Sequence, residues 1–358
     1  MHTLLASAYV HGIDPVIFQI TETFAVRWYG LSYAAGFLIA WLIYRWFART
    51  DRSPLSVQSV GDLMFYGIIG VMVGGRLGYA VFYQPALLYT FSGDFPFWDL
   101  LAINKGGMAS HGGMLGVLAA IWLFSRRQKV PALHVMDVGA LAASPGLFLG
   151  RIANFINAEL WGEPLANQQS PPGWAVKYPQ EMHYWPVERL RELRGVVDEV
   201  RISASEWDFA LARIAADEAD PPADAFRLVR ETTERLIEAV QAGNTTVVEA
   251  IRPMLTAYYP SQLFQALSDG PVLFGILALV WLRPRKPGVI AGTFLLAYGV
   301  LRIITELFRQ PDAALVLGLS RGQALSSLMV ITGLIMIIVC QRRHVPRLGG
   351  LRGVGTGD

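Results

Sequence analysis

Long apolar runs alternate with short polar segments along this chain of 358 residues. Seven of the runs contain 19 or more residues each, which is enough for a helix to cross the hydrocarbon core of a bilayer. They cover residues 29–47, 61–83, 107–125, 133–152, 262–282, 288–307 and 322–340. The pattern predicts an all-α integral membrane protein with seven transmembrane helices.

Glycines are concentrated in the second of these runs. They are Gly67, Gly70, Gly74, Gly75 and Gly78. Small residues let the backbones of neighbouring membrane helices approach closely. The glycines of this run therefore allow another helix to approach it closely.

The stretch between the fourth and fifth runs, residues 161–259, differs in character, and we call it the acidic segment. Residues 165–258 contain 15 Asp and Glu against 10 Lys and Arg. A capping-box pattern at Ser203 and Glu206 begins one helix, and Gly243-Asn244 ends another. The sequence thus predicts a helical insert, which serves either as a solvated, non-catalytic appendage or as a lid or docking surface over a site.

Composition supports this organisation. With 53% hydrophobic and 16% charged residues, the chain is too apolar for an ordinary soluble domain. Its single cysteine, Cys340, excludes an intrachain disulfide and a cysteine-based metal cluster. We expect no metal, no cofactor and no nucleic-acid partner. The predicted parts are residues 1–160 with spans one to four, the acidic segment, and residues 260–358 with spans five to seven and a basic tail.

Lysines and arginines gather in alternate loops. The rich loops and the tail contain Arg45, Arg49, Arg52, Arg126, Arg127, Lys129, Arg283, Arg285, Lys286, Arg342, Arg343, Arg347 and Arg352. The short loops between them offer only Lys105, Arg309 and Arg321. The positive-inside rule therefore places the N-terminus outside and the C-terminus in the cytoplasm. The acidic segment is then extracytoplasmic.

A polar patch from Gly150 to Gly162 follows directly on the apolar run of the fourth span. On a helix, Arg151 and Asn154 share one face. Ionisable groups at membrane depth are costly unless paired or hydrated, and by default they mark a functional site. A lone arginine that snorkels from a helix end is the simpler interpretation. Four polar groups within nine residues favour the functional one.

Further polar side chains lie near the outer ends of other predicted spans. His111 begins the third, and Arg302 and Glu306 are four residues apart on one helix face of the sixth. Arginine binds phosphate through paired, charge-assisted hydrogen bonds, and histidine is suited to accept a proton near neutral pH. Because phospholipid headgroups are the nearest phosphates, the set indicates lipid-headgroup chemistry.

Simpler interpretations of these side chains stay open at this point. His111 is alternatively an interfacial hydrogen bonder, and Arg302 with Glu306 is alternatively a structural pair. Arg76, within the glycine-rich second run, either snorkels or binds lipid.

These residues resemble the bacterial phosphatidylglycerol–prolipoprotein diacylglyceryl transferase family. The family's signature is similar to the stretch Gly150-Arg151-x-Ala153-Asn154-Phe155-Ile156-Asn157-x-Glu159-x-x-Gly162. Further matches are Trp28-Tyr29-Gly30, Gly74-Gly75-Arg76-Leu77-Gly78-Tyr79, Ser110-His111-Gly112-Gly113, Pro260-Ser261-Gln262-Leu263, and Tyr298-Gly299 through Arg302, Glu306 and Phe308-Arg309-Gln310-Pro311-Asp312. Together they span nearly the whole chain except the acidic segment.

The resemblance implies an enzyme of the bacterial inner membrane with seven spans and a periplasmic N-terminus. Its reaction would transfer sn-1,2-diacylglyceryl from phosphatidylglycerol to the lipobox cysteine thiol of a preprolipoprotein, with a thioether and sn-glycerol 1-phosphate as products. The expected partners are phosphatidylglycerol, the lipobox segment and membrane lipids. Because the nucleophile belongs to the substrate, the enzyme needs no catalytic cysteine.

The resemblance also implies roles for the matching residues. Arg151 would bind the lipid phosphate, and His111 would accept the thiol proton, with an arginine-linked group as the alternative base. Arg302, oriented by Glu306, would be a second phosphate or headgroup contact, or a gate. Neutral donors would be Asn154 and Asn157. Supporting positions are Tyr29, Glu159, Gly162 and Arg309.

The chain departs from the family pattern at two places, and two other functions would also fit some of its features. Tyr259 stands where the family commonly has a basic residue, and Phe264-Gln265 replaces a common Tyr-Glu, so a carboxylate near span five is missing. A phospholipid transporter or flippase would also gather arginines, but the internal repeats expected of it are not found. A channel or structural protein is disfavoured by the outward clustering of Arg, His and Glu.

Overall fold

The computed structural model describes residues 7–21, 24–93, 95–102, 106–217, 220–310 and 320–352. The chain divides into two compact units. Unit 1 comprises Met1–Ser32, Leu149–Leu267 and Ile304–Gly322, and unit 2 comprises Tyr33–Phe148, Ser268–Ile303 and Gln323–Asp358. Lys105, Pro311 and Asp312, which entered the loop-charge pattern or the family resemblance, lie outside the described residues.

Among the described residues, six helical stretches are long and apolar enough to cross a membrane. They are Trp28–Arg49 (α1), Ser59–Phe82 (α2), Ala132–Ile156 (α4), Ser261–Val280, Val289–Glu306 (α11) and Gly322–Arg342, which is nearly all of α12 (Arg321–Arg342). The fourth stretch combines α9 (Ser261–Leu267), a π-helical turn (Ser268–Val272) and α10 (Leu273–Val280). The prediction of a predominantly helical membrane protein is confirmed, and each of these stretches coincides with an expected apolar run.

The third expected span forms a helix, α3 (Ser110–Gln128), but it is not among the six. Its 19 residues end in a basic turn with Arg126 and Arg127, which lowers the mean hydropathy of any long window within it. The seventh span therefore stays a prediction.

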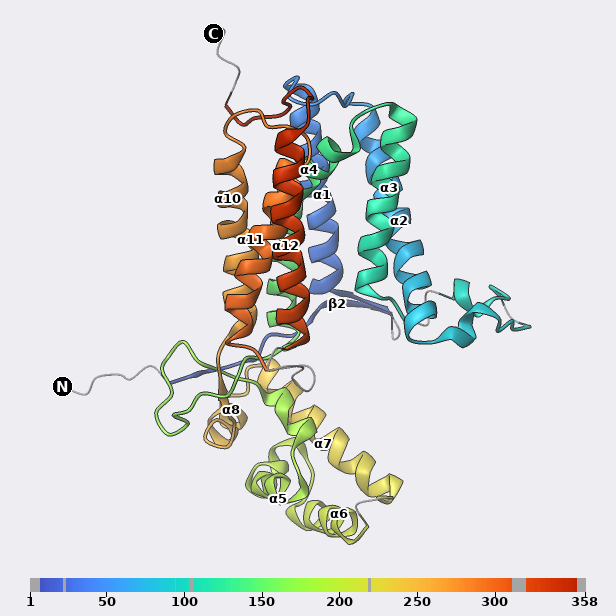
Figure 1. The fold of residues 1–358 in the computed structure, drawn as a ribbon. Helices are drawn as coiled ribbons and strands as arrows, with labels where there is room; N and C mark the ends of the chain where they lie inside the picture. Colours follow the sequence, from blue (N-terminus) through green and yellow to red (C-terminus); the bar gives the residue numbers. More distant parts are fainter. Residues whose placement is uncertain are drawn as a thin grey trace, which may run out of the picture. The chain divides into compact units, whose positions relative to one another are not determined.

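Helices α2 and α3 lie side by side in unit 2 (Figure 1), and their contact is made by glycines. A Cβ added to Gly70 would lie 2.5 Å from the Gly116 carbonyl oxygen, and one added to Gly78 would lie 2.7 Å from the Cα atom of Gly112. Such distances leave no room for a side chain, so the two backbones are in direct contact. The close helix approach that these glycines allow is thus made between α2 and α3.

The remaining core of unit 2 is built from larger side chains. Phe47, Phe124, Leu273 and Trp281 are almost fully buried in one hydrophobic cluster. At its edge the Asp137 carboxylate accepts hydrogen bonds from the backbone N–H groups of Gly288 and Ala291, both 2.8 Å long. Asp137 thereby satisfies amide groups at the start of α11.

The described residues of unit 1 form five short strands that the sequence did not predict. β1 (Tyr9–Val10) pairs in parallel with β4 (Val176–Lys177), which pairs antiparallel with β5 (Ala257–Tyr258). β2 (Val16–Thr21) pairs antiparallel with β3 (Phe24–Arg27). Three of the strands have two residues each, which is too short to produce an alternating pattern.

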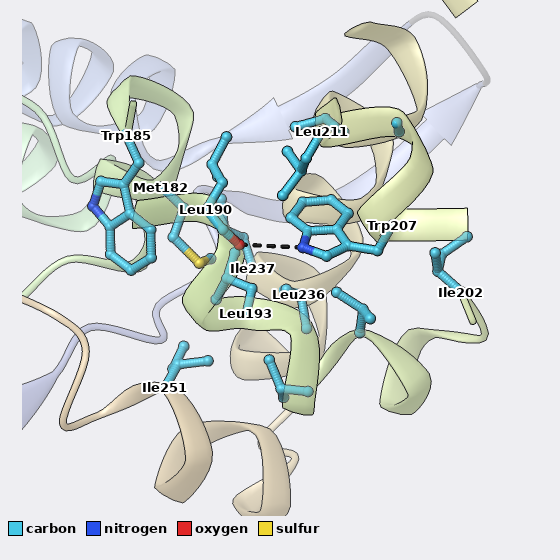
Figure 2. Close-up of a cluster of buried hydrophobic side chains, with 14 of the residues drawn as sticks. Met182, Trp185, Leu190, Leu193, Ile202, Trp207, Leu211, Leu236, Ile237 and Ile251 are labelled. Atoms are coloured by element: carbon cyan, nitrogen blue, oxygen red, sulfur yellow. Dashed lines mark hydrogen bonds between the residues drawn. The ribbon is translucent and has the colours of Figure 1, made fainter. Parts of the chain in front are cut away.

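The acidic segment folds as helices around a core of its own. Short 3₁₀ turns at Pro179–Tyr184, Arg191–Gly195 and Val197–Val200 accompany α5 (Val187–Leu190), α6 (Ala204–Ala216), α7 (Ala223–Gln241) and α8 (Thr245–Ile251). Figure 2 shows Trp207, Leu193, Leu211 and Leu236 packed together, with the indole Nε1–H of Trp207 donating to the Leu190 carbonyl at 3.2 Å. The capping box at Ser203 and Glu206 is confirmed.

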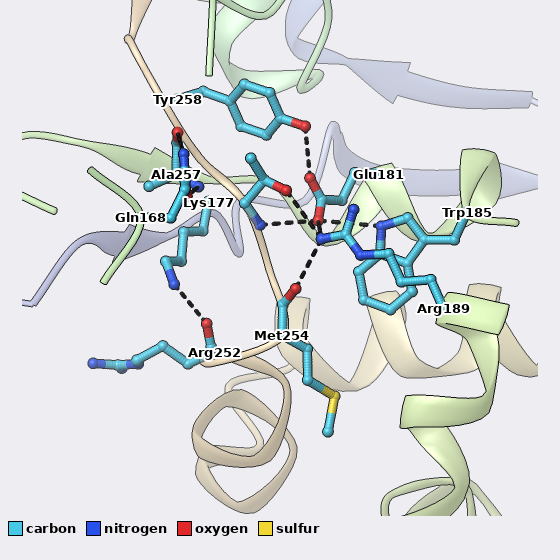
Figure 3. Close-up of polar contacts among 10 residues, drawn as sticks. Gln168, Lys177, Glu181, Trp185, Arg189, Arg252, Met254, Ala257 and Tyr258 are labelled. Atoms are coloured by element: carbon cyan, nitrogen blue, oxygen red, sulfur yellow. Dashed lines mark hydrogen bonds and ion pairs between the residues drawn. The ribbon is translucent and has the colours of Figure 1, made fainter. Parts of the chain in front are cut away.

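A buried carboxylate ties this helical core to strand β5. Figure 3 shows Glu181 accepting hydrogen bonds from the Tyr258 hydroxyl at 2.7 Å and from Arg189 at 2.9 Å. The Thr256 N–H and the Trp185 indole also donate to it. Because a buried charge is stable only when it is paired and hydrogen-bonded, this set of partners is what allows Glu181 to be buried. It also holds the 3₁₀ turn at Pro179–Tyr184 against the end of the acidic segment.

Candidate active site

The polar patch begins on α4 and continues into a tight turn. Arg151 and Asn154 both lie within α4, one turn apart, so they share a face as predicted. After Ile156 the backbone turns sharply, since Ala158 and Leu160 adopt left-handed conformations with φ of 51° and 58°. The Glu159 N–H donates to the Asn154 carbonyl at 2.9 Å, which closes the turn onto the helix end.

Asn154 is buried, and Tyr29 holds its side chain. The Tyr29 hydroxyl donates a 2.9 Å hydrogen bond to Asn154 Oδ1. The acceptor end of the amide is thereby engaged, so the Nδ2 end is the one suited to donate to an anion. The structure thus brings together two residues that the sequence placed more than 100 positions apart.

Asn157 has a more local task. Its Nδ2 group donates to the Ala153 carbonyl at 2.8 Å, one turn back on α4. This bond satisfies a carbonyl at the helix end. One N–H of the amide that was expected to face phosphate is therefore used within the helix.

The turn at Glu159 and Leu160 is clamped by two buried side chains from the start of α9. Gln262 Nε2 donates to the Glu159 carbonyl at 2.6 Å, and Ser261 Oγ donates to the Leu160 carbonyl at 3.0 Å. The Tyr178 hydroxyl in turn donates to Gln262 Oε1 at 3.1 Å. Both ends of the Gln262 amide are therefore used. The turn is held through the backbone carbonyls of Glu159 and Leu160.

Sequence reasoning assigned no role to Ser261 and Gln262, although their segment resembled the family. The signal that pointed to them was a pair of polar residues at the start of a membrane-length apolar run. Both are at most 1% exposed. Buried polar groups are hydrogen-bonded as a rule, so a partner had to exist.

Gly162 is surrounded by backbone on two sides. It forms a β-bridge with Arg309, and the neighbouring Glu163 N–H donates to the Phe308 carbonyl at 3.0 Å. A Cβ on Gly162 would lie 2.7 Å from the Phe308 oxygen and would also overlap the Tyr259 oxygen. No other residue fits here without separating the segments that contain Tyr259 and Phe308.

Glu306 and Arg309 are both buried and form an ion pair. Arg309 Nη1 lies 3.9 Å from Glu306 Oε2, and the Ser320 hydroxyl donates to Glu306 Oε1 at 3.2 Å. The carboxylate expected to orient Arg302 therefore also has Arg309 beside it, three residues further on. The pairing of Arg302 with Glu306 stays a prediction.

Glu159 lies at the exposed edge of this group. Nearby protein atoms still withhold part of its hydration, which raises the pKa of its carboxyl. Its backbone carbonyl, in contrast, is fixed by Gln262.

Aromatic rings pack around the turn at residues 158–161, and a histidine lies among them. Trp161 stacks on Tyr178 with ring centroids 5.4 Å apart. His11 is fully buried, 5.2 Å from the Phe155 ring and 5.5 Å from the Tyr178 ring. Desolvation lowers the pKa of His11 to about 4, so it is neutral near pH 7. Nothing in the apolar pattern marked this histidine.

The predicted site residues fall into two groups by unit. Those in unit 1 are Tyr29, Arg151, Asn154, Asn157, Glu159, Gly162, Glu306 and Arg309. His111, exposed at the second position of α3, and Arg302, half-buried on α11, belong to unit 2. That these two act together with the first group stays a prediction.

Arg76 is neither a snorkelling side chain nor a lipid ligand, and both alternatives for it were wrong. Its guanidinium is buried and donates to five backbone carbonyls. These belong to Asp99, Leu100, Ala102, Gly106 and Gly107. An arginine side chain has five N–H groups, so none is left for a phosphate. Arg76 fixes the loop between α2 and α3.

Comparisons with known proteins agree with one another. The family model described as prolipoprotein diacylglyceryl transferase matches residues 15–339. A relative from Bdellovibrio bacteriovorus, named phosphatidylglycerol–prolipoprotein diacylglyceryl transferase, is 44% identical over 347 residues, covering 95% of this chain and 96% of its own. Relatives of the same name from Photorhabdus laumondii and Cereibacter sphaeroides are 37% and 34% identical, covering 91% and 92% of this chain and 92% and 97% of their own. The chain belongs to the prolipoprotein diacylglyceryl transferase family.

Proposed function

We propose that this protein transfers the sn-1,2-diacylglyceryl group of phosphatidylglycerol to the lipobox cysteine of a preprolipoprotein, the first step of lipoprotein maturation. The observation that carries the proposal is the match over almost the full chain to relatives named for this reaction. The same names remove the support for a transporter or flippase, because each of them describes a transferase.

At the reacting glycerol carbon one bond forms and one breaks, and the thiol proton is transferred separately. The cysteine sulfur attacks the glycerol carbon that carries the phosphodiester, and a C–S thioether bond forms. The bond between this carbon and the phosphate oxygen breaks, and sn-glycerol 1-phosphate leaves with the electron pair. The thiol proton passes to a base, since the thiolate is the effective nucleophile.

Arg151 is the residue we assign to the lipid phosphate. Its planar fork suits a phosphodiester and offsets the negative charge of the leaving group. Asn154 lies one turn further on α4 with its acceptor end bound to Tyr29, which leaves its Nδ2 group directed to donate. Asn157 and Glu159 continue the same segment.

His111 is the base we favour, with an arginine-linked group as the alternative. Its position at the beginning of α3 exposes the imidazole. Arg302 is a second headgroup contact or a gate, oriented by Glu306. Unchanged turnover of a His111→Asn variant across the pH range would exclude His111 from the role.

Gly162 and Arg309 complete the set as supporting residues. Their β-bridge joins the end of the polar patch to the segment that follows α11.

Unit 1 supports a membrane topology with seven spans. Its strands β1 and β4 are hydrogen-bonded, so residues 9–10 and 176–177 must lie on the same side of the membrane. An even number of crossings is then required between them, whereas α1, α2 and α4 provide only three. We therefore assign α3 as the fourth crossing despite its lower hydropathy.

The loop charges orient this topology in a bacterial inner membrane. Arginine-rich loops lie on the cytoplasmic side, so the N-terminus and unit 1 face the periplasm and the C-terminus faces the cytoplasm. The parts are then residues 1–160 with four spans, the periplasmic acidic segment 161–259, and residues 260–358 with three spans. Substrates are phosphatidylglycerol and the lipobox segment, surrounded by membrane lipids.

The test supplies the purified protein with phosphatidylglycerol and a lipobox peptide. We expect a thioether-linked diacylglyceryl peptide by mass spectrometry and an equal amount of glycerol phosphate. A peptide with serine in place of the lipobox cysteine is the control for the nucleophile. No lipidated peptide, under conditions in which a known family member produces it, would overturn the proposal.

A further inference from the structure

Aromatic rings crowd the loop between α2 and α3, residues 83–102, which we call the aromatic arm. It contains two 3₁₀ turns, Pro85–Leu88 and Asp99–Leu101. Large side chains that are more than half exposed on it are Tyr83, Tyr89, Phe91, Phe95, Phe97 and Leu101. The only charged residues in the arm are two aspartates, Asp94 and Asp99. This composition is unusual for a loop that is surrounded by water.

The arm has a defined internal structure. Arg76 donates to the carbonyls of Asp99 and Leu100 at 2.7 and 2.8 Å. Phe91 stacks on Trp98 with ring centroids 5.9 Å apart, and the Trp98 indole donates to the Leu88 carbonyl at 3.3 Å. These hydrogen bonds and the ring stacking therefore fix the backbone of the arm on which the exposed rings lie.

A small core of its own anchors the arm on α2. Leu87 and Leu100 are buried against Ala80 near the end of that helix. These two leucines are buried, whereas five aromatic side chains of the arm are more than half exposed. Although some of these rings contact one another, the described residues of the arm leave them more than half exposed.

The position of the arm identifies the partner. It follows directly on α2, whose exposed side chains include Phe65, Met72, Val73, Val81 and Phe82. The arm extends sideways from the ends of α2 and α3, across the helix axes (Figure 1). For a helix that crosses a bilayer, this direction lies along the membrane surface. The exposed rings continue the lipid-facing surface of α2 to the zone where the bilayer meets water.

We propose that the aromatic arm is inserted in the interfacial layer of the lipid leaflet at the α2–α3 end. Aromatic rings concentrate at this depth in membrane proteins because one part of the ring system is apolar and the surroundings are partly hydrated. Two aspartates and no basic residue mean that apolar burial, rather than attraction to anionic lipid, provides the driving force.

The arm then controls the depth of the first turn of α3. Arg76 also donates to the Gly107 carbonyl at 3.0 Å, and the Ala109 N–H donates to the Gly75 carbonyl at 2.9 Å. These bonds tie the end of the arm and the start of α3 to the same turn of α2. An arm fixed at the interface keeps His111 at headgroup level.

A fluorophore on the arm tests this placement. The single cysteine is replaced by Cys340→Ser, and Phe95→Cys or Tyr89→Cys is labelled with an environment-sensitive dye. The matched control is Phe209→Cys on α6 of the acidic segment, because Phe209 is 66% exposed and Tyr89 is 71% exposed. The full-length proteins are reconstituted in phosphatidylcholine–phosphatidylglycerol vesicles that contain lipids spin-labelled at shallow or deep positions.

We expect blue-shifted emission at both arm sites and quenching several-fold stronger by shallow than by deep spin labels. The Phe209 site should keep water-like emission and little quenching. Arm labels that behave like the Phe209 label, that are quenched best by deep spin labels, or that are blue-shifted without any lipid quenching would each overturn the proposal. The last outcome would indicate a protein partner. The measurement needs no turnover, so it is independent of the proposed reaction.

Discussion

Arg76 and Arg151 both lie in apolar helices, yet their surroundings give them different tasks. Arg76 is saturated by five backbone carbonyls, so replacing it would disturb the loop before α3. Arg151 is half-buried one turn before Asn154, on the segment most similar to the family signature. The charge of the two residues is equal, and only the partners distinguish them.

Arg151→Lys tests the assignment of the phosphate contact. Lysine keeps the positive charge but loses the planar, bidentate fork, so we expect turnover to fall by roughly 100-fold or more. The measurement is thioether formation at saturating phosphatidylglycerol. The control is Arg126→Lys. Arg126 is exposed in the last turn of α3, at the opposite end of that helix from His111, so this variant should keep full turnover. Equal rates for wild type and Arg151→Lys would remove Arg151 from the site.

His11 gives unit 1 a dependence on pH. Its folded pKa is about 4 and its ordinary value is 6.5, so the unfolded chain binds more protons between these values. The stabilisation contributed by the neutral ring is complete above pH 6.5 and is lost as the pH falls towards 4. Across the full pH range from 6.5 to 4, the free energy of unfolding falls by about 3 kcal/mol.

The corresponding measurement is the apparent Tm in detergent at pH 7 and pH 5. We expect the wild type to lose more Tm on acidification than His11→Phe, which keeps an aromatic ring between Phe155 and Tyr178 without a titratable group. The same pH dependence in both proteins would contradict the assignment.

At the scale of elements, the start of α9 and the end of α4 act as one piece. Gln262 connects the Glu159 carbonyl to the Tyr178 hydroxyl, and Ser261 binds the next carbonyl. The turn between two left-handed residues is therefore held by side chains from another element. The residues of this segment that we propose to contact the substrate therefore depend on that clamp for their positions.

Gln262→Met preserves the volume of the side chain and removes both hydrogen bonds. We expect kcat to fall roughly 10- to 100-fold, because small displacements of catalytic groups are costly, whereas the KM for the peptide changes little. Gln262→Glu should fall as far, since a carboxylate accepts from Tyr178 but cannot donate to Glu159.

The control is Gln168→Met, which removes a comparable amide clamp on the Leu165 and Ala257 backbones. It should leave kcat within about threefold of wild type, since its contacts are away from the turn. If Gln262→Met and Gln168→Met behave alike, the clamp has no special connection with turnover.

The sequence predicted long elements well and short contacts poorly, for a physical reason. Hydropathy is summed over about 20 residues, so six apolar helices and even the capping box at Ser203 were recoverable from local pattern. Two-residue strands carry no such pattern.

The site was predicted to the same limited extent. The neighbours Arg151 and Asn154 follow from helix periodicity, but the bond from Gln262 to Glu159 joins residues 103 positions apart. His11 was missed because a lone histidine near the N-terminus gives no sign of burial. The bond between Gln262 and Glu159 and the burial of His11 are determined by tertiary structure alone.

At the scale of the whole molecule, the order of the crossings is the main open prediction. The acidic segment and the C-terminal tail are separated by three predicted spans, so they should face opposite sides of the membrane. Phe209→Cys and His344→Cys, each in a Cys340→Ser background, report the two sides because both positions are exposed.

A membrane-impermeant maleimide added to intact spheroplasts should label Phe209→Cys at once and His344→Cys only after lysis. The background protein without any cysteine controls for non-specific labelling. Labelling of both sites before lysis, or of His344→Cys alone, is incompatible with the proposed orientation.

The three-stranded sheet of unit 1 also constrains the biogenesis of the protein. Tyr9 is made before the membrane-length helices, but its partner Val176 follows only after four helices, and Tyr258 follows later still. Within unit 1, the bridge from Gly162 to Arg309 needs a residue that is made later again. The N-terminal strand is therefore unpaired until β4 has been made. In the proposed orientation, the exported N-terminal strand exposes an edge during that interval, and this edge must be kept from pairing elsewhere.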